Sequence, residues 1–361
     1  MHRELRTLPA VAIGYAFAAL LCYLFYRAES RRLDRSRNLI LVILIVLLTG
    51  FVNQVHHYFV DQGTGWSQPT NTVWQERLQI NVVNMAPGVA PHSYRFLPNG
   101  IVLWMQLLRV DFWAARDIYR LIFGLLLFYA IYRFARLYTD YLGCLLTLLL
   151  VAVVYPMSFE NYAGQLTDPL SHLSFVLAFI FLATGNFELL LSTLLIGSLA
   201  KETVLALSGF YLLFCRRDKG YLWKAPVLCL ASLAVYYGVR LFVLHGALQQ
   251  YRQVSGVDPN HIATNFFGPT WALAALILLA YVVFLALAWK ETPAFLNRLA
   301  LYLIPVLLVS NLFFGWLRET RNYMPAVFVL AVIAGRYISR RCASSEAGGA
   351  VQSSFQRTSP L

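Results

Sequence analysis

The chain of 361 residues is 59% hydrophobic and only 13% charged, with a mean hydropathy of +0.61. This composition is too apolar for a soluble globular protein, because a hydrocarbon core of about 30 Å is spanned by roughly 20 apolar residues and the chain holds many such runs. The net charge of +12 lies largely in short loops between the runs, which argues against a basic face that follows a nucleic-acid backbone. We therefore expect membrane lipids, and no nucleic acid, among its partners.

Eleven apolar runs predict about 11 transmembrane helices, and hence an all-α, polytopic integral membrane protein. The first run leads straight into a cluster of arginines, and its only Ala-x-Ala pattern lies inside the run, so we expect a retained helix and not a cleaved signal peptide. In chain order the runs cover residues 8–26, 38–55, 118–134, 142–157, 170–184, 187–199, 203–215, 225–244, 270–289, 299–315 and 323–336.

Basic residues gather in alternate loops between these runs. The first loop, residues 27–37, holds five arginines against Glu29 and Asp34, so the positive-inside rule places it in the cytoplasm. Arg3 and Arg6, on the opposite side, depart from the rule. Alternation puts four further basic segments on the cytoplasmic side, namely Arg133 with Arg136, residues 216–219, residues 290–298, and Arg336 with Arg340 and Arg341.

Two short runs, residues 187–199 and 203–215, allow two interpretations. As a hairpin, they place Lys201 and Glu202 at the outer face. As a single helix, they place this pair in mid-membrane and reverse the side of every later loop. We prefer the hairpin because it keeps the basic turn at residues 216–219 in the cytoplasm.

The sequence predicts one membrane domain, residues 1–341, with no soluble domain appended. Residues 342–361 are rich in Ser, Gly and Ala and are expected to form a disordered cytoplasmic tail. No Cys-x-x-Cys pair occurs, so neither a disulfide framework, nor a metal site, nor a cofactor is indicated. The five cysteines are Cys22, Cys144, Cys215, Cys229 and Cys342.

The longest connection, residues 56–117, is expected at the outer face, where long connections are commonly functional. Its many aromatic and apolar residues argue against disorder. Within residues 101–110, Trp104, Leu107 and Leu108 share one side and polar residues take the other. This pattern predicts a helix that lies on the membrane interface.

The predicted outer turns mostly carry both signs of charge, which suggests a polar cavity, although helix-end charges that reach water explain any single one. Asp168 precedes Pro169 at the start of an apolar run, a pattern typical of a helix N-cap. His172 lies four residues further on and shares the helix face of Asp168. A carboxylate that orients a histidine is therefore the functional alternative.

Arginines recur at the late outer turn and at the end of the long outer loop. Arg318 and Arg321 are three residues apart and would project from one face of a helix, an arrangement suited to holding a phosphate. An ordinary turn in which Glu319 is the internal partner explains them as well. Arg95, beside Tyr94, is either an interface anchor or a further phosphate ligand.

Five short motifs occur together in this chain. They are an acidic residue in the long first outer loop (Asp61), a Tyr-Arg-x-x-Pro return (94–98), a Thr-Asp-Pro helix start (167–169), an Ala-Lys-Glu turn (200–202) and an Arg-Glu-x-Arg turn (318–321). Over residues 38–336, the arrangement resembles the multi-spanning glycosyltransferases of the GT-C superfamily. The resemblance implies an all-helical protein of the bacterial inner membrane whose donor is a polyprenyl-phosphate sugar.

The same resemblance places the catalytic carboxylate in the first outer loop, at Asp61. Family members often carry paired acidic residues there, whereas here Glu76 follows fifteen residues later and is the reserve candidate. Sugar transfer from a lipid phosphate needs a carboxylate to take the acceptor's proton and cations to hold the departing phosphate. The predicted substrate-binding residues are Arg95, Asp168, His172, Lys201, Glu202, Arg318 and Arg321.

Three other functions stay open at this point. A transporter or flippase of a lipid-linked or anionic substrate predicts broken helices and an internal repeat, of which only the short pair at 187–199 and 203–215 is seen. A polymerase or ligase of lipid-linked glycans typically has a large late outer loop, whereas residues 245–269 and 316–322 are modest in length. The third is a non-catalytic membrane scaffold.

Overall fold

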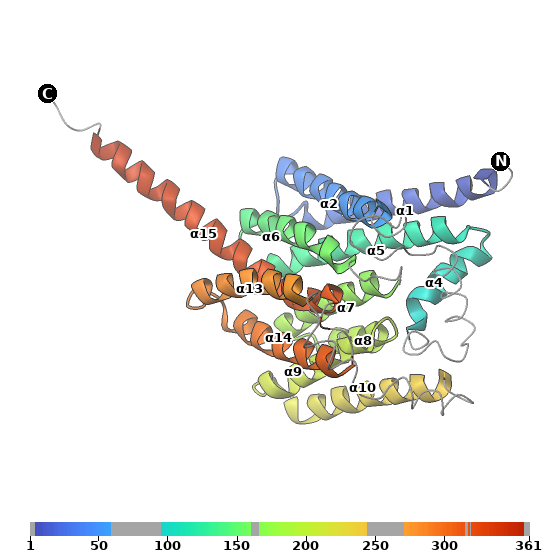
Figure 1. Cartoon of the computed structure of the whole chain (residues 1–361). Coiled ribbons are helices and arrows are strands. Elements are labelled where there is room, and N and C mark those ends of the chain that lie inside the picture. The colour runs from blue at the N-terminus through green and yellow to red at the C-terminus, as the bar shows by residue number, and fades with distance from the viewer. Residues whose placement is uncertain are drawn as a thin grey trace.

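The computed structural model describes residues 4–58, 95–159, 166–243, 271–314, 317 and 319–356. Throughout these residues the regular elements are helices (Figure 1). The α-helices are α1 (Glu4–Glu29), α2 (Arg35–His56), α4 (Phe96–Leu107), α5 (Phe112–Ala135), α6 (Tyr141–Val154), α7 (Thr167–Thr184), α8 (Phe187–Ser198), α9 (Ala206–Phe214), α10 (Tyr221–Val243), α13 (Trp271–Ala288), α14 (Ala294–Phe314) and α15 (Met324–Gln356). Short 3-10 helices are η3 (Tyr155–Phe159), η4 (Glu202–Leu205) and η5 (Thr320–Tyr323).

Seven of the described helical segments are long and apolar enough to cross a membrane. Three shorter apolar helices coincide with three more of the predicted runs. They are Phe187–Ser198, Glu202–Phe214 and Ala275–Ala288. The fold class is therefore all-helical, and the helices are compatible with a multi-pass membrane protein. The count of about eleven spans stays a prediction.

Polar residues fix where several helices begin and end. The side chains of Asp34, Asp111, Asp140 and Asn186 accept hydrogen bonds from the first backbone N–H groups of α2, α5, α6 and α8. Gly185, at φ 71°, ends α7 in the left-handed conformation that glycine adopts without strain. These caps satisfy backbone groups that an apolar surrounding would leave unpaired.

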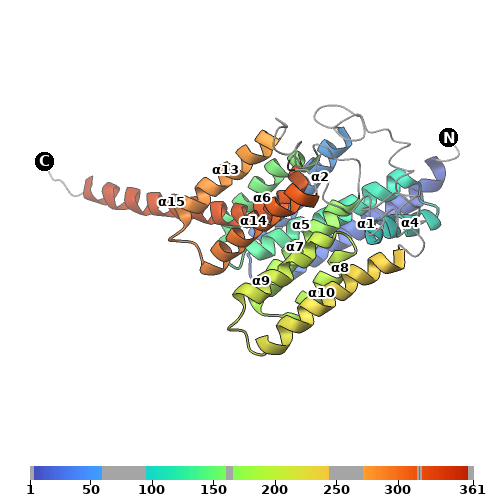
Figure 2. The same ribbon diagram turned by 60° about the horizontal axis from the view of Figure 1, so that its bottom comes forward.

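Residues 187–214 form a hairpin, as the sequence predicted, and not a single helix. The ring of Phe187 at the start of α8 lies 6.0 Å from that of Tyr211 near the end of α9, and 5.3 Å from that of Trp223 in α10. The two short helices therefore run antiparallel, and Lys201 lies in the turn between them. In Figure 2, α8, α9 and α10 lie together at one side of the bundle.

The basic loops gather at one end of the bundle, named here the basic end. Four side-chain contacts show this, because each one joins two segments that are distant in sequence. These contacts are Arg133 with Glu29 at 3.5 Å, Tyr141 with the carbonyl oxygen of Arg37 at 2.7 Å, Ser339 with Asp140 at 2.7 Å, and Arg341 with Glu291 at 3.3 Å. The alternation of basic loops read from the sequence thus corresponds to a spatial separation.

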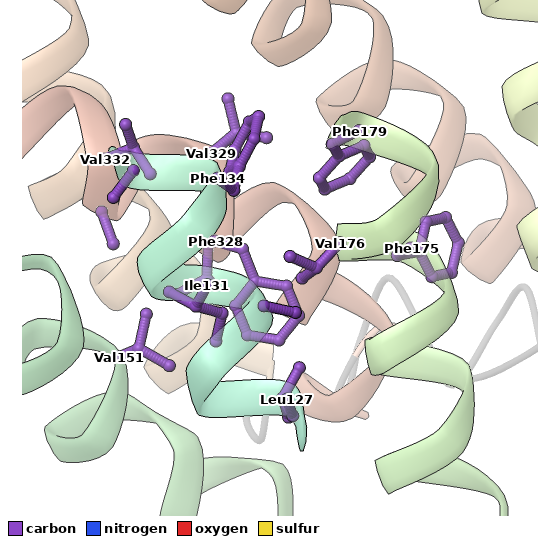
Figure 3. Close-up of a cluster of buried hydrophobic side chains, with 14 of the residues drawn as sticks. Leu127, Ile131, Phe134, Val151, Phe175, Val176, Phe179, Phe328, Val329 and Val332 are labelled. Atoms are coloured by element: carbon purple, nitrogen blue, oxygen red, sulfur yellow. The ribbon is translucent and has the colours of Figure 1, made fainter. Parts of the chain in front are cut away.

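Helices α5, α6, α7 and the first half of α15 enclose the core. Figure 3 shows side chains from these four helices meeting, among them Phe134, Val151, Phe175 and Phe328. Helices α6 and α15 approach closely at Gly335, where an added Cβ would lie 2.7 Å from the carbonyl oxygen of Gly143. Close approach at small residues is a common way for membrane helices to pack.

Two predictions concern the periphery. Helix α4 covers most of the predicted interfacial segment and packs against α5. Trp104 and Leu107 of α4, and Leu108 just after it, are exposed, and the interfacial position stays a prediction. Helix α15 continues to Gln356, whereas the sequence predicts a disordered tail from Cys342. That last part of α15 projects away from the other helices (Figure 1).

The separation of the two ends generates a test of orientation. In a variant without the native cysteines, we expect Arg217→Cys, in the exposed turn at the basic end, to react with a membrane-impermeant maleimide only after permeabilisation. Asp117→Cys, exposed near the start of α5 at the opposite end, should react in intact cells. The reverse labelling pattern would place the basic loops outside and reject the positive-inside assignment.

Candidate functional site

The end opposite to the basic end holds a buried cluster of charged side chains. Arg95 precedes α4, Asp168 lies in the first turn of α7, Lys201 occupies the turn of the α8–α9 hairpin, and Arg321 lies in η5. All four are buried. The backbone N–H of Leu97 donates to the carbonyl oxygen of Leu199 over 3.2 Å, so the start of α4 is fixed beside the hairpin turn.

Asp168 is the centre of this cluster. Its Oδ1 lies 3.4 Å from Lys201 Nζ, and its Oδ2 lies 3.6 Å from Arg321 Nη1. Lys201 Nζ also donates to Asn322 Oδ1 over 2.7 Å. Buried charges are tolerated when they are paired. Oδ1 of Asp168 accepts a hydrogen bond from Lys201, whereas Oδ2 is paired with Arg321 without a hydrogen bond.

Two glutamates complete the cluster and are its more exposed members. Arg95 makes a two-point contact with Glu202, with Nε to Oε2 at 3.2 Å and Nη2 to Oε1 at 3.1 Å. Arg321 donates from Nε and Nη2 to Oε2 of Glu319 over 3.2 and 3.1 Å. Three cations therefore meet three carboxylates, counting Lys201 with Asp168.

The helix-cap interpretation of Asp168 is wrong. The structure has Leu166 at the N-cap position of α7, with no side-chain cap, and the Asp168 carboxylate faces Lys201 and Arg321 instead. A charge-assisted contact with two cations is stronger than one hydrogen bond to a backbone N–H group. The proline after Asp168 still lies in the first turn, where its missing N–H costs nothing.

His172 holds the neighbouring turn and does not bond to Asp168. Its Nδ1 lies 2.9 Å from the hydroxyl of Tyr155, and its Nε2 lies 3.1 Å from the carbonyl oxygen of Arg321. A carbonyl oxygen only accepts, so Nε2 carries a proton, and in the neutral ring Nδ1 then accepts from the hydroxyl. The neutral imidazole thus connects η3 to η5 and positions Arg321.

Burial and charge set the ionisation of the groups outside the spans. Burial lowers the pKa of the Lys201 ammonium to about 8, and Asp168 opposes this shift while Arg321 and Arg95 add to it. Burial raises the pKa of the Glu319 carboxyl, but Arg321 and Lys201 outweigh burial and bring it below its usual value. Glu319 is therefore ionised at neutral pH, and Lys201 is close to its titration range.

The structure brings together six of the nine predicted site residues. They are Arg95, Asp168, His172, Lys201, Glu202 and Arg321. Asp61, Glu76 and Arg318 lie outside the described residues. The sequence analysis missed Asn311, Asn322 and Tyr155, whose polar groups join the network. Asn311 could have been found from the sequence, because a polar asparagine is unusual within an apolar run. Nothing in the sequence around Tyr155 indicates its role.

A second group of cations lies on α5. Arg116 and Arg120 are one helical turn apart and buried. The ring of Phe159 lies 5.4 Å from the guanidinium carbon of Arg120 and 5.0 Å from the ring of His56. Tyr119, between the two arginines in sequence, donates to the carbonyl oxygen of Leu166 over 2.9 Å, which connects this part of α5 to the start of α7.

An apolar pocket borders the charged cluster. Thr320 and Tyr323, on either side of Arg321 in η5, belong to its lining. The remaining lining residues come from α6, η3, α13 and α15, and they are Val154, Met157, Ile277, Leu278, Met324 and Val327. Charged groups and an apolar surface thus share one short turn. In the described part of the chain, no group of three His, Cys, Asp or Glu residues is arranged to hold a metal ion.

The chain matches no protein family, no curated protein and no solved structure.

The central position of Asp168 generates a stability prediction. We expect Asp168→Asn to lower the free energy of unfolding by about 3–5 kcal/mol, because Lys201 and Arg321 would stay buried without their shared carboxylate. Thermal unfolding in detergent would measure the change. Glu291→Gln, which breaks an exposed ion pair with Arg341, is the matched control and should change stability by less than about 1 kcal/mol. Equal losses in both variants would contradict the assignment.

Proposed function

We propose that the protein is a GT-C-like membrane glycosyltransferase that moves a sugar from a lipid-phosphate donor to an acceptor at the outer face of the membrane. The observation that carries this proposal is the convergence of Arg95, Lys201 and Arg321, from three separate segments, at the end of an apolar helical bundle. A membrane protein that needed only solubility at this end could use neutral polar residues. Buried ionisable groups in such proteins are usually functional.

The three cations are the proposed holders of the donor phosphate. A phosphate leaving a sugar gains charge, and arginine and lysine side chains in a site of low dielectric constant stabilise that charge strongly. Lys201 and Arg321 both contact Asp168, so they lie within reach of one common group. Arg318, next to Glu319 in sequence, is a further candidate.

Asp61 is the proposed general base, and Glu76 is the reserve. Of the carboxylates in the described cluster, Asp168 is the least suited to this role, because a carboxylate engaged by two cations accepts a proton poorly. Glu202 and Glu319 are each engaged by an arginine. The base is therefore sought in the first outer loop, where the resemblance puts it.

The proposal also requires access from the lipid phase, because the donor's tail stays in the bilayer. The apolar pocket that borders η5 has a volume of only about 10 Å³, so the donor's chain would have to lie along the outside of the helices and not inside this pocket. A lipid-phosphate flippase is the second candidate function, and the short α8–α9 hairpin with Lys201 in its turn favours it. The described cations of the cluster lie at one end, which suits a surface reaction better than passage across the bilayer.

The first functional prediction concerns the base. With purified protein in nanodiscs and a panel of polyprenyl-phosphate sugars, we expect Asp61→Asn to reduce transfer on the order of a hundredfold or more, because the amide has nearly the same shape but cannot accept a proton. Folding should be unchanged, and Glu291→Gln should transfer like the wild type. Wild-type turnover by Asp61→Asn would reject Asp61 and direct attention to Glu76. Movement of the lipid between leaflets without sugar transfer would favour the flippase.

The second functional prediction concerns pH. Binding of an alkyl phosphate should weaken from about pH 7.5 to about pH 9.5, since Lys201 loses its charge in this range while the phosphate, with a second pKa of about 6, is already dianionic. The groups that face Lys201 are Asp168, His172, Arg95, Glu319 and Arg321. Lys201→Arg keeps its charge and should bind with little pH dependence. Isothermal titration at each pH gives the affinity, and an equal decline in both proteins would exclude Lys201 as the cause.

A further inference from the structure

We propose that Glu202 and Glu319 are internal substitutes for the anionic group of the ligand, and that a phosphate binds by displacing them from Arg95 and Arg321. This inference rests on the proposed function, because it takes the two arginines as phosphate holders. It adds a role for two carboxylates that the transfer reaction does not use. The site described above is then the closed, ligand-free arrangement.

The contact geometry supports the exchange. Arg95 presents Nε and Nη2 to the two carboxylate oxygens of Glu202, and this two-point geometry is the one that a guanidinium uses for a phosphate. Arg321 uses the same pair of nitrogens, but both go to a single oxygen, Oε2 of Glu319, which also accepts from Asn322 Nδ2 over 3.0 Å. Each glutamate therefore occupies the face of an arginine that a phosphate would need.

The exposed fractions of the three carboxylates separate an inner group from an outer pair. The side chain of Asp168 is 6% exposed, whereas those of Glu202 and Glu319 are 21% and 16% exposed. Asp168 is also fixed by two cations. The two glutamates have longer side chains and are more exposed than Asp168, and we take them as the carboxylates that an entering anion meets first.

Charge balance makes displacement the favourable route. The cluster holds three cations and three carboxylates, so a phosphate that entered without displacing either glutamate would leave a negative excess in a buried site. When a glutamate turns outward, its charge returns to water and the arginine keeps a partner. The exchange also keeps weakly binding anions out of the site, because they cannot displace a carboxylate that contacts an arginine through two hydrogen bonds.

The test measures binding of inorganic phosphate and of an alkyl phosphate to the purified full chain in nanodiscs. Glu202→Gln and Glu319→Gln should each bind both probes about tenfold more tightly than the wild type, because a neutral amide competes less well for a guanidinium. Glu291→Gln is the matched control, since it alters an arginine–glutamate pair at the basic end, and it should bind like the wild type. Wild-type or weaker affinity in both glutamine variants would overturn the proposal.

Two further variants keep the test decisive. Glu202→Asp keeps the charge but shortens the side chain, so it should fold where the amide does not and should tighten binding by a smaller factor. Arg95→Gln and Arg321→Gln separate this inference from the proposed function. If they lose phosphate binding while the glutamine variants bind like the wild type, the exchange fails and the phosphate site stands. If they bind phosphate like the wild type, the phosphate is held elsewhere and the proposed function loses its support.

Discussion

The contact of one buried carboxylate with two cations is the constraint on which this end of the bundle depends. Asp168 belongs to α7, Lys201 to the hairpin turn and Arg321 to η5, so one side chain fixes three segments. Loss of Asp168 would leave two buried cations without their shared carboxylate, whereas loss of Lys201 or Arg321 would leave Asp168 with a single cation. His172 reinforces the arrangement, because it bonds the backbone of Arg321 and the hydroxyl of Tyr155. The segments that bring Arg95 and Glu202 together are positioned by the same contacts.

The two ends of the bundle use charge in different ways. At the basic end, the ion pairs of Arg341 with Glu291 and of Arg37 with Asp34 are exposed and contribute little to stability, although Glu29, which faces Arg133 there, is buried. At the opposite end the pairs are buried, and their desolvation is costly. Solubility and membrane orientation explain the first arrangement. The buried ion pairs at the opposite end need another explanation, and we propose that they serve ligand binding.

The helices were largely predictable from the sequence, whereas the site was predictable only in part: six predicted residues meet in one cluster, but their contacts were not foreseen. Apolar runs and loop charges depend on neighbouring residues, so they predicted the helix order and the α8–α9 hairpin. The role of Asp168 depends on Lys201, 33 residues away, and on Arg321 in another segment, so its local pattern suggested a helix cap. The extent of α15 beyond Cys342 was likewise not predicted, since that segment has a composition typical of a disordered tail.

Lys201 makes stability and binding depend on pH in opposite directions. Its pKa is about 8 in the folded protein against an ordinary value of 10.5, so between these values the unfolded chain binds more protons than the folded one. The free energy of unfolding therefore rises with pH across this window, because the folded state no longer holds a buried ammonium. The anion binding that we propose needs that ammonium, so we expect it to weaken as the pH rises through the pKa of about 8.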